Sequence, residues 1–259
     1  MKMDSRGKKI FSSQQSAFSI QHSALSIQRS AENIKFAIPD YFRKSKRLKT
    51  MILITEIETP IGKMTACAVE AGVCLLEFSD REGLSLDIET LARRWKNPQI
   101  AHLENLPQIT QQVNDPQSAN LANYPQVAHM ANLQRQLDEY FHGALKDFRI
   151  PVVLTGTEFQ QKTWQALQTI PYGTTITYKE QAASLNMPDS IRAIANANAL
   201  NNCLIIVPCH RVIGTSGSLT GYKGELWRKR FLLDLERKHT GIEKGQQVID
   251  FGESAVSIQ

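Results

Sequence analysis

The sequence predicts two folded regions, an α/β region followed by a mostly helical one. From Met51 onward, short runs of apolar and β-branched residues are separated by glycine and proline turns, a pattern typical of strands. From Thr157 onward, short amphipathic segments begin at capping residues, which indicates helices. A length of 259 residues is enough for two domains. We therefore expect a basic, disordered or spurious extension over 1–50, an α/β domain over 51–150, a helical domain over 155–240 and a flexible tail over 241–259.

The first fifty residues do not show the pattern of a folded domain. They contain a seven-residue near-repeat, Ser16–His22 followed by Ser23–Arg29, and a basic run at Arg43–Lys49. They hold 11 Lys and Arg against 3 Asp and Glu, so they supply most of the basicity behind the net charge of +5. We expect the true start at Met51, although the repeat also fits an amphipathic helix or an arm that contacts phosphates.

The α/β region begins with three expected strands. The run Met51–Asp80 contains a Pro-Ile-Gly turn and an Ala-Gly turn between apolar segments. Cys67 and Cys74 fall in these strands, where we expect them to be small core residues. A segment over 98–131 is rich in Gln, Asn and Ala and shows little pattern. The apolar spacing over 133–141 then predicts a helix that ends at a glycine.

The second region is marked by helix starts. Two capping boxes, Thr157–Gln160 and Thr177–Glu180, predict two helices, and a third short helix is expected from Asp189 or Ser190. The last two, joined by a tight turn, predict a helix-turn-helix, a shape that binds DNA in many proteins but not in all. Behind Arg192 the third helix carries almost only small side chains, which favours close approach to a nucleic-acid backbone or groove.

A Pro-Cys-His-Arg sequence at 208–211 follows an apolar run that we interpret as a buried strand. A cysteine in such a strand is usually a core residue, and we place Cys203 there. Cys209 is different, because the adjacent imidazole and guanidinium favour a reactive thiolate. The four cysteines form neither a CxxC pair nor a disulfide framework, so we expect free thiols in a reducing cytoplasm, with no metal and no cofactor. With no apolar run of membrane length and no secretory signal, we expect no membrane association.

These motifs together resemble the O6-alkylguanine-DNA alkyltransferases, also called methylated-DNA–protein-cysteine methyltransferases. The resemblance covers Phe159–Glu236 and runs through FQQKTWQALQTIPYGTTITY, PCHRVIG, GYKG and RKRFLLDLE in the family's order and spacing. The α/β region matches more loosely. The resemblance implies a ribonuclease-H-like N-terminal domain followed by a winged-helix-like, DNA-binding alkyltransferase domain.

The resemblance also implies an activity, which is DNA repair by a suicide enzyme. The alkyl group of O6-methylguanine, and of O4-methylthymine, is transferred irreversibly to Cys209 in a single turnover. In the family, a water held by the histidine that matches His210 takes the thiol proton, and the glutamate that matches Glu236 orients that histidine. The tyrosine that matches Tyr178 assists the leaving guanine.

The implied partner is alkylated double-stranded DNA, bound through the minor groove by a monomer with the damaged nucleotide flipped out of the stack. In the family, an arginine that matches Arg192 fills the space left by the flipped nucleotide. The remaining DNA-binding positions match Ala193 and the hinge residue Asn201. The wall of the base pocket matches Tyr178, Val212, Tyr222 and Lys223.

Other interpretations remain open for several of these residues. Glu236 also fits a solvated helix end, Tyr178 a core tyrosine, and Arg192 a surface charge. We interpret the basic run Arg228–Arg230 as a solvated face, with Lys229 at a position where the family often has lysine. The chain departs from the family pattern, which usually has glycine or proline, at Asn186, Ala195, Ala199, Asn202 and Glu225.

Two other functions are compatible with parts of the sequence. A non-catalytic protein that binds alkylated bases and flags them for other pathways would share the fold, but such proteins replace the cysteine that Cys209 matches. A thiol hydrolase would use Cys209 and His210, but no oxyanion hole is evident.

Overall fold

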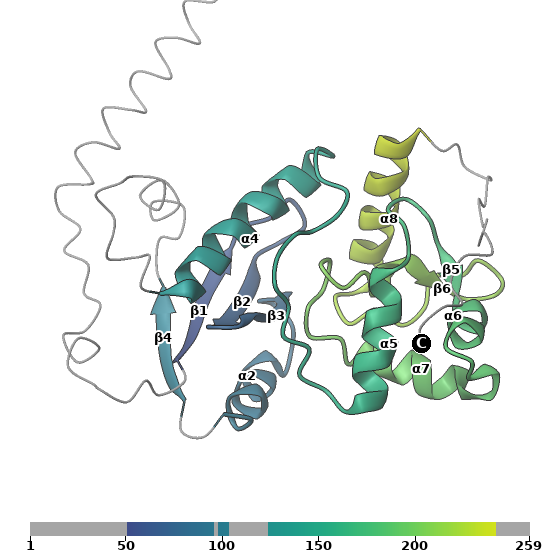
Figure 1. Cartoon of the computed structure of the whole chain (residues 1–259). Coiled ribbons are helices and arrows are strands. Elements are labelled where there is room, and N and C mark those ends of the chain that lie inside the picture. The colour runs from purple at the N-terminus through teal and green to yellow at the C-terminus, as the bar shows by residue number, and fades with distance from the viewer. Residues whose placement is uncertain (1–50, 96–97, 104–123, 242–259) are drawn as a thin grey trace, which may run out of the picture. The chain divides into compact units, whose positions relative to one another are not determined.

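A four-stranded sheet in the order β3-β2-β1-β4 forms the first part of the computed structural model (Figure 1). The strands are β1 (Met51–Ile57), β2 (Met64–Val69), β3 (Gly72–Phe78) and β4 (Gln99–Leu103). The first three pair in antiparallel fashion, as the two predicted turns require, and β4 runs parallel to β1. The structure describes residues 51–95, 98–103 and 124–241, so the expected extension over 1–50 and nearly all of the expected tail lie outside it.

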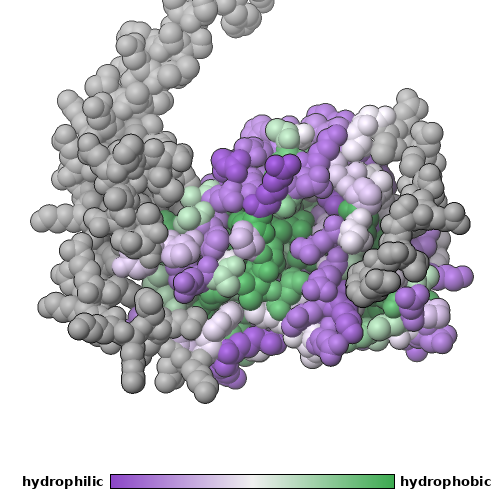
Figure 2. All heavy atoms as spheres, in the orientation of Figure 1, coloured by the Kyte–Doolittle hydropathy of each residue, from purple (hydrophilic) through white to green (hydrophobic). Residues whose placement is uncertain are grey.

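Both faces of this sheet are covered by a helix, which explains why its strands are apolar on both sides. Helix α4 (Pro125–Phe141) packs against β1, β2 and β3, and its own residues Met130, Leu133 and Tyr140 are fully buried. Helix α2 (Leu84–Ala92) closes the opposite face over a second apolar cluster. Apolar side chains also appear as green spheres in the middle of the face drawn in Figure 2, among hydrophilic ones.

The prediction for this region was incomplete. Helix α4 begins at Pro125, two turns before the expected start, because proline suits the first turn of a helix. Strand β4 and helix α2 were not predicted. Strand β4 lies in the stretch over 98–131 that showed little pattern, and alternate residues of this edge strand are exposed.

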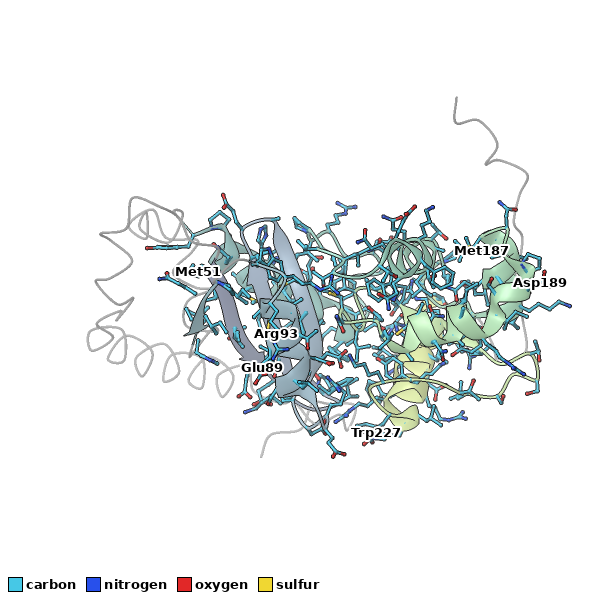
Figure 3. All side chains as sticks on the ribbon, turned by 90° about the horizontal axis from the view of Figure 1, so that it is seen from below. Met51, Glu89, Arg93, Met187, Asp189 and Trp227 are labelled. Atoms are coloured by element: carbon cyan, nitrogen blue, oxygen red, sulfur yellow. The ribbon has the colours of Figure 1, made fainter. Side chains whose placement is uncertain are left out.

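The second part contains four helices: α5 (Glu158–Gln168), α6 (Tyr178–Ser184), α7 (Ile191–Ala199) and α8 (Leu226–Thr240). The capping boxes that were predicted at the starts of α5 and α6 are both formed. A 3-10 turn over Pro188–Ser190 leads into α7, and α6 and α7 contact each other and α5. The predicted helix-turn-helix is therefore confirmed, and Met187 and Asp189 mark its turn in Figure 3.

The small residues of α7 have two different surroundings. Ala193 is exposed, but Ala197 and Asn198 are buried against α5 and α6. The Trp164 indole donates a hydrogen bond to the Ala197 carbonyl at 2.7 Å, and the Asn198 amide donates to Gln181 at 2.7 Å. Part of the small-residue pattern therefore serves helix packing, and only the exposed part remains available to a nucleic acid.

The expected strand before Cys209 was wrong. Residues 204–206 form a turn, and the next strand is β6 (Val212–Ile213), which pairs in parallel with β5 (Ile176–Thr177). Ile205 has a φ of 70°, a conformation that is costly for a β-branched residue and that persists only where the surroundings enforce it. The chain thus bends sharply on its way into the Pro-Cys-His-Arg sequence.

Strand β3 also supports this bend. The Leu76 amide donates to the Asn202 carbonyl at 2.7 Å, and the Leu204 amide donates to the Leu76 carbonyl at 2.9 Å. The described residues accordingly belong to one compact unit. Within the described ranges, no helix has the length and apolar content needed to cross a bilayer.

Candidate active site

Cys209 begins a 3-10 turn, Cys209–Arg211, and only 3% of its surface is exposed. Asn201 holds the sulfur in place: its Nδ2 lies 3.2 Å from Cys209 Sγ and 2.8 Å from the Val207 carbonyl oxygen. Burial raises the pKa of Cys209 to about 11, although the Asn201 hydrogen bond and the Lys229 charge both lower it. The resting thiol is therefore protonated at neutral pH, and its reaction as a nucleophile requires a base.

His210 and Glu236 form a fully buried pair, with His210 Nε2 2.9 Å from Glu236 Oε1. Burial lowers the pKa of His210 from its ordinary 6.5, so the imidazole is neutral at pH 7. Because the ionised carboxylate can only accept a hydrogen bond, the proton of the neutral imidazole is on Nε2, and Nδ1 is an acceptor. No side chain or backbone group of the described residues forms a hydrogen bond with Nδ1. The alternative interpretation of Glu236 as a solvated helix end was wrong.

Three further groups converge on the Glu236 carboxylate. The Arg211 guanidinium donates through Nε to Oε2 and through Nη2 to Oε1, both at 3.0 Å. The Gly173 amide donates to Oε2 at 2.9 Å, and the Tyr140 hydroxyl donates to Oε1 at 2.8 Å. Burial alone would raise the pKa of Glu236, but His210 and Arg211 outweigh it and hold the pKa well below 4.5. The carboxylate is therefore ionised and rigidly held.

Tyr140 is a site residue that the sequence analysis missed. It comes from α4 and is fully buried, and we had assigned it only to an apolar helix face. Nothing in its sequence context distinguishes it from a core tyrosine, because its partner lies 96 residues away.

The interpretation of Arg228–Arg230 as a solvated face was wrong for two of its three residues. Lys229 is fully buried and donates from Nζ to the Val212 carbonyl at 2.6 Å and to the Thr220 carbonyl at 2.7 Å. Burial lowers the pKa of Lys229 to about 8, and the nearby Cys209 opposes this shift. Arg228 is buried as well, with its guanidinium 4.0 Å from the centre of the Phe78 ring. The positive charge of Lys229 is thus close to the thiol.

Two of the expected base-pocket residues, Tyr178 and Tyr222, lie near Cys209. Val212 and Tyr222 are buried, and the half-buried Tyr178 donates from its hydroxyl to the Thr220 carbonyl at 3.2 Å. Burial, and after it the Cys209 charge, raises the pKa of both tyrosines. Both phenols therefore keep their protons near the sulfur, which a group that donates to a leaving base requires.

The side chain of Lys223 points away from this group. Its Nζ lies 2.9 Å from Glu77 Oε1, 3.0 Å from Asp87 Oδ2 and 3.2 Å from Asn202 Oδ1. Only the backbone of Lys223 is thus free for the pocket role. Glu77 was also missed by the sequence analysis, although a lone carboxylate in the apolar run Gly72–Phe78 is a visible signal.

The expected DNA-binding residues divide into two groups. Arg192 and Ala193 are exposed on α7. Asn201, in contrast, is fully buried and its side chain contacts the cysteine. At two positions where the family usually has glycine, the backbone keeps a conformation that favours glycine: φ is 57° at Asn186 and 72° at Glu225. Of the residues that the structure describes, no three His, Cys, Asp or Glu side chains come together in a way that would hold a metal ion.

The chain matches two family models. Residues 52–154 match the ribonuclease-like domain of 6-O-methylguanine DNA methyltransferase, and residues 158–238 match the DNA-binding domain of the same family. The ribonuclease-like match and the mixed sheet followed by helices confirm the expected fold class.

Curated relatives and solved structures agree with this match. The chain is 54% identical over 105 residues to a methylated-DNA–protein-cysteine methyltransferase of Mycolicibacterium paratuberculosis, an alignment that covers 40% of this chain and 64% of the relative. It is 57% identical over 102 residues to the protein of that name from Mycobacterium leprae, covering 39% and 62%. The chain therefore spans slightly less than two thirds of the length of these curated relatives.

Among solved structures, the crystal structure of Mycobacterium tuberculosis OGT in complex with DNA is similar to this one. It has a TM-score of 0.55 at 33% identity, and the similarity covers 72% of this chain and 94% of that chain. Sequence motifs, site geometry and these comparisons agree, and the chain belongs to the 6-O-methylguanine DNA methyltransferase family.

Proposed function

We propose that this protein repairs DNA by transferring the methyl group of O6-methylguanine to Cys209. The observation that carries the proposal is the buried His210–Glu236 pair, which begins at the residue next to the cysteine. A thiol with a raised pKa is unreactive by itself, and a neutral imidazole backed by an ionised carboxylate is the base that such a thiol needs.

In the proposed reaction, His210 Nδ1 takes the Cys209 proton through a bridging water. The sulfur then attacks the methyl carbon, so the S–C bond forms as the bond from that carbon to O6 breaks, and the bonding electrons pass to the guanine. The leaving base takes a proton from Tyr178, and Tyr178 regains a proton from solvent while the His210 imidazolium releases one to it. The net change is transfer of a methyl group to sulfur and of the thiol proton to guanine.

Two groups support this chemistry electrostatically. Glu236 stabilises the imidazolium that forms on His210, and Lys229 stabilises the thiolate before attack. The product is a thioether, which ordinary thiol exchange does not reverse, so each protein molecule acts once. We include O4-methylthymine as a second substrate, because its alkyl group is also carried on an exocyclic oxygen.

We further infer that the DNA is double-stranded and is bound through its minor groove by a monomer. A base inside the stack is out of reach of a buried cysteine, so the damaged nucleotide must be flipped. Arg192 and Ala193 are exposed on α7, where Arg192 is free to fill the space that the base leaves. The relative from Mycobacterium tuberculosis was crystallised with DNA, which supports this partner.

The division of the chain into domains over 51–150 and 155–240 is part of the same proposal, supported by family matches over 52–154 and 158–238. A non-catalytic protein that flags alkylated bases remains the alternative. Cys209 argues against it, because recognition alone needs no nucleophile.

The test is the mass of the intact protein after incubation with a duplex that contains one O6-methylguanine. We expect a gain of one methyl group, located on the peptide that bears Cys209, and no turnover beyond one equivalent. Cys209→Ala should gain nothing and still bind the duplex. Label on Cys67, Cys74 or Cys203 instead, or catalytic turnover, would contradict the proposal.

A further inference from the structure

Strand β3 carries a buried carboxylate that the proposed mechanism does not use. Glu77 is fully buried, with Lys223 Nζ 2.9 Å from Oε1 and Arg81 Nε 3.3 Å from Oε2. Within the described residues neither oxygen accepts a hydrogen bond of good geometry, so these contacts are ion pairs. A buried carboxylate costs free energy unless it is paired, and the pairing here links the sheet to the segment that follows Gly221.

Lys223 is the centre of this link. Besides Glu77, its Nζ contacts Asp87 Oδ2 of helix α2 at 3.0 Å. It also contacts Asn202 Oδ1, in the segment that leads to Cys209, at 3.2 Å. We call Glu77, Asp87, Asn202 and Lys223 the pocket clamp. Lys223 directly follows Tyr222, one of the residues close to the thiol, so a displacement of Lys223 also moves Tyr222.

Strand β3 holds the two sides of the pocket at once. Its Leu76 exchanges backbone hydrogen bonds with Asn202 and Leu204, on the segment that leads to the cysteine. Its next two residues contact the segment that follows Tyr222: Glu77 pairs with Lys223, and Phe78 lies against Gly224. Phe78 packs so closely on Gly224 that a Cβ built there would lie 2.6 Å from the ring. One strand of the sheet thus supports both the nucleophile and the opposite wall.

We propose that Glu77 is a positioning residue for the alkylated purine base: through Lys223 it sets the distance between the Tyr222 wall and Cys209. This inference rests on the proposed function. Placement matters strongly for methyl transfer, because the sulfur, the methyl carbon and O6 must be aligned, and an error of about 1 Å can cost on the order of 100-fold in rate.

The charge of Glu77 also acts directly on the thiol, in the opposite sense. Glu77 is one of the groups that raise the pKa of Cys209. Replacing it by glutamine therefore makes the thiol slightly easier to ionise while it loosens the pocket wall. A reagent that needs only the thiolate and a substrate that needs the pocket should respond differently.

The experiment compares the full-length protein with Glu77→Gln in two reactions of Cys209. The first is methyl transfer from a duplex with one O6-methylguanine, and the second is alkylation by iodoacetamide at the same pH, with the modified peptide identified by mass spectrometry. We expect transfer to fall about 10-fold or more, while alkylation of Cys209 stays equal or becomes faster. Equal transfer, or a parallel fall in both reactions, would overturn the proposal.

A matched control is available on the same part of the protein. Glu89 pairs with Arg93 at 3.5 Å on the exposed surface of α2 (Figure 3), so Glu89→Gln removes the same charge without touching the clamp. It should leave both reactions unchanged. A loss of transfer in Glu89→Gln equal to that in Glu77→Gln would refute a specific role for Glu77.

A double mutant tests the route through Lys223. Lys223→Met should lower transfer by about as much as Glu77→Gln, and the double variant should be no slower than Lys223→Met alone. If the double variant loses transfer rate by the product of the two single losses, Glu77 does not act through Lys223. If Glu77→Gln does not fold, Asp87→Asn is tested in the same two reactions, because Asp87 is partly exposed. A smaller fall in methyl transfer without a fall in alkylation supports the pocket clamp. No difference between the two reactions overturns it.

The result separates the two hypotheses. If the wild-type protein does not methylate Cys209, the proposed function fails. If the wild type is active and Glu77→Gln equals it, only the positioning role fails.

Discussion

At the scale of single residues, the site is organised around Glu236 rather than around the cysteine. Its two oxygens accept from His210, Arg211, Gly173 and Tyr140, which come from three separate stretches of the chain. The family resemblance implied the pairing of His210 with Glu236. Tyr140 could not be predicted, because a tyrosine on an apolar helix face looks the same whether or not its hydroxyl meets a carboxylate.

Tyr140→Phe removes one donor from Glu236 and nothing else. We expect the free energy of unfolding to fall by about 1.5–3 kcal/mol, the range for hydrogen bonds to charged groups. The carboxylate should then interact more strongly with His210 and raise the histidine pKa. Chemical denaturation measures the first effect, and the pH dependence of methyl transfer should show the second as an acid limb moved to higher pH.

Tyr172→Phe is the matched control. Tyr172 stacks edge-on against Tyr140 with ring centres 5.9 Å apart, and its buried hydroxyl has no hydrogen-bond partner within the described residues. Removing that hydroxyl should cost no stability and should leave the pH dependence in place. Equal behaviour of the two variants would mean that the Tyr140 hydroxyl does nothing specific for Glu236.

At the scale of elements, local signals were reliable where the backbone itself decides the structure. The capping boxes and the helix-turn-helix were predicted, because caps satisfy amide groups within a few residues. The strand before Cys209 was predicted wrongly, because a short apolar run fits any buried segment and the bend at Ile205 depends on tertiary contacts. The basic run at the start of α8 was misinterpreted for a related reason, since composition does not reveal the carbonyls that Lys229 meets.

Glu225, which precedes α8, offers a test of backbone strain. Its φ of 72° and ψ of 147° belong to a region that is almost exclusive to glycine, and its side chain is exposed. We expect Glu225→Gly to raise the free energy of unfolding by about 1 kcal/mol, as measured by chemical denaturation. Asn186→Gly is the control, because asparagine tolerates a φ of 57° and little should be gained. A gain at Asn186 as large as that at Glu225 would argue against strain as the cause.

At the scale of the whole molecule, the two parts of the chain share the site. Tyr140 and Glu77 come from the helix and strand of the first part, and Glu236 and Lys223 come from the second. The fold class and the nucleophile were predictable because strand pattern, caps and the cysteine motif are local. The shared contacts were not, because each joins residues that are far apart in sequence.

This shared site also predicts how the stability of the whole protein depends on pH. His210 and Glu236 both have pKa values lowered from their ordinary 6.5 and 4.5, so each binds its proton less readily in the folded protein than in the unfolded chain. The unfolded state therefore takes up more protons on acidification, and stability falls as pH falls. Glu77 acts in the opposite sense, since burial raises its pKa, but it is one group against two.

We expect the free energy of unfolding to decrease below pH 6.5 as the histidine of the unfolded chain becomes charged, and more steeply below pH 4.5 as glutamate is protonated. Urea denaturation at pH 7, 5.5, 4.5 and 3.5 measures this profile. His210→Gln keeps an N–H donor for Glu236 but cannot titrate, so its stability should fall less than that of the wild type between pH 7 and 5.5. Below pH 4.5 both proteins should also lose stability, because both keep Glu236. The same fall for both proteins between pH 7 and 5.5 would mean that His210 is not held neutral in the folded protein, and His210 would then lack the free acceptor that the proposed deprotonation of Cys209 requires.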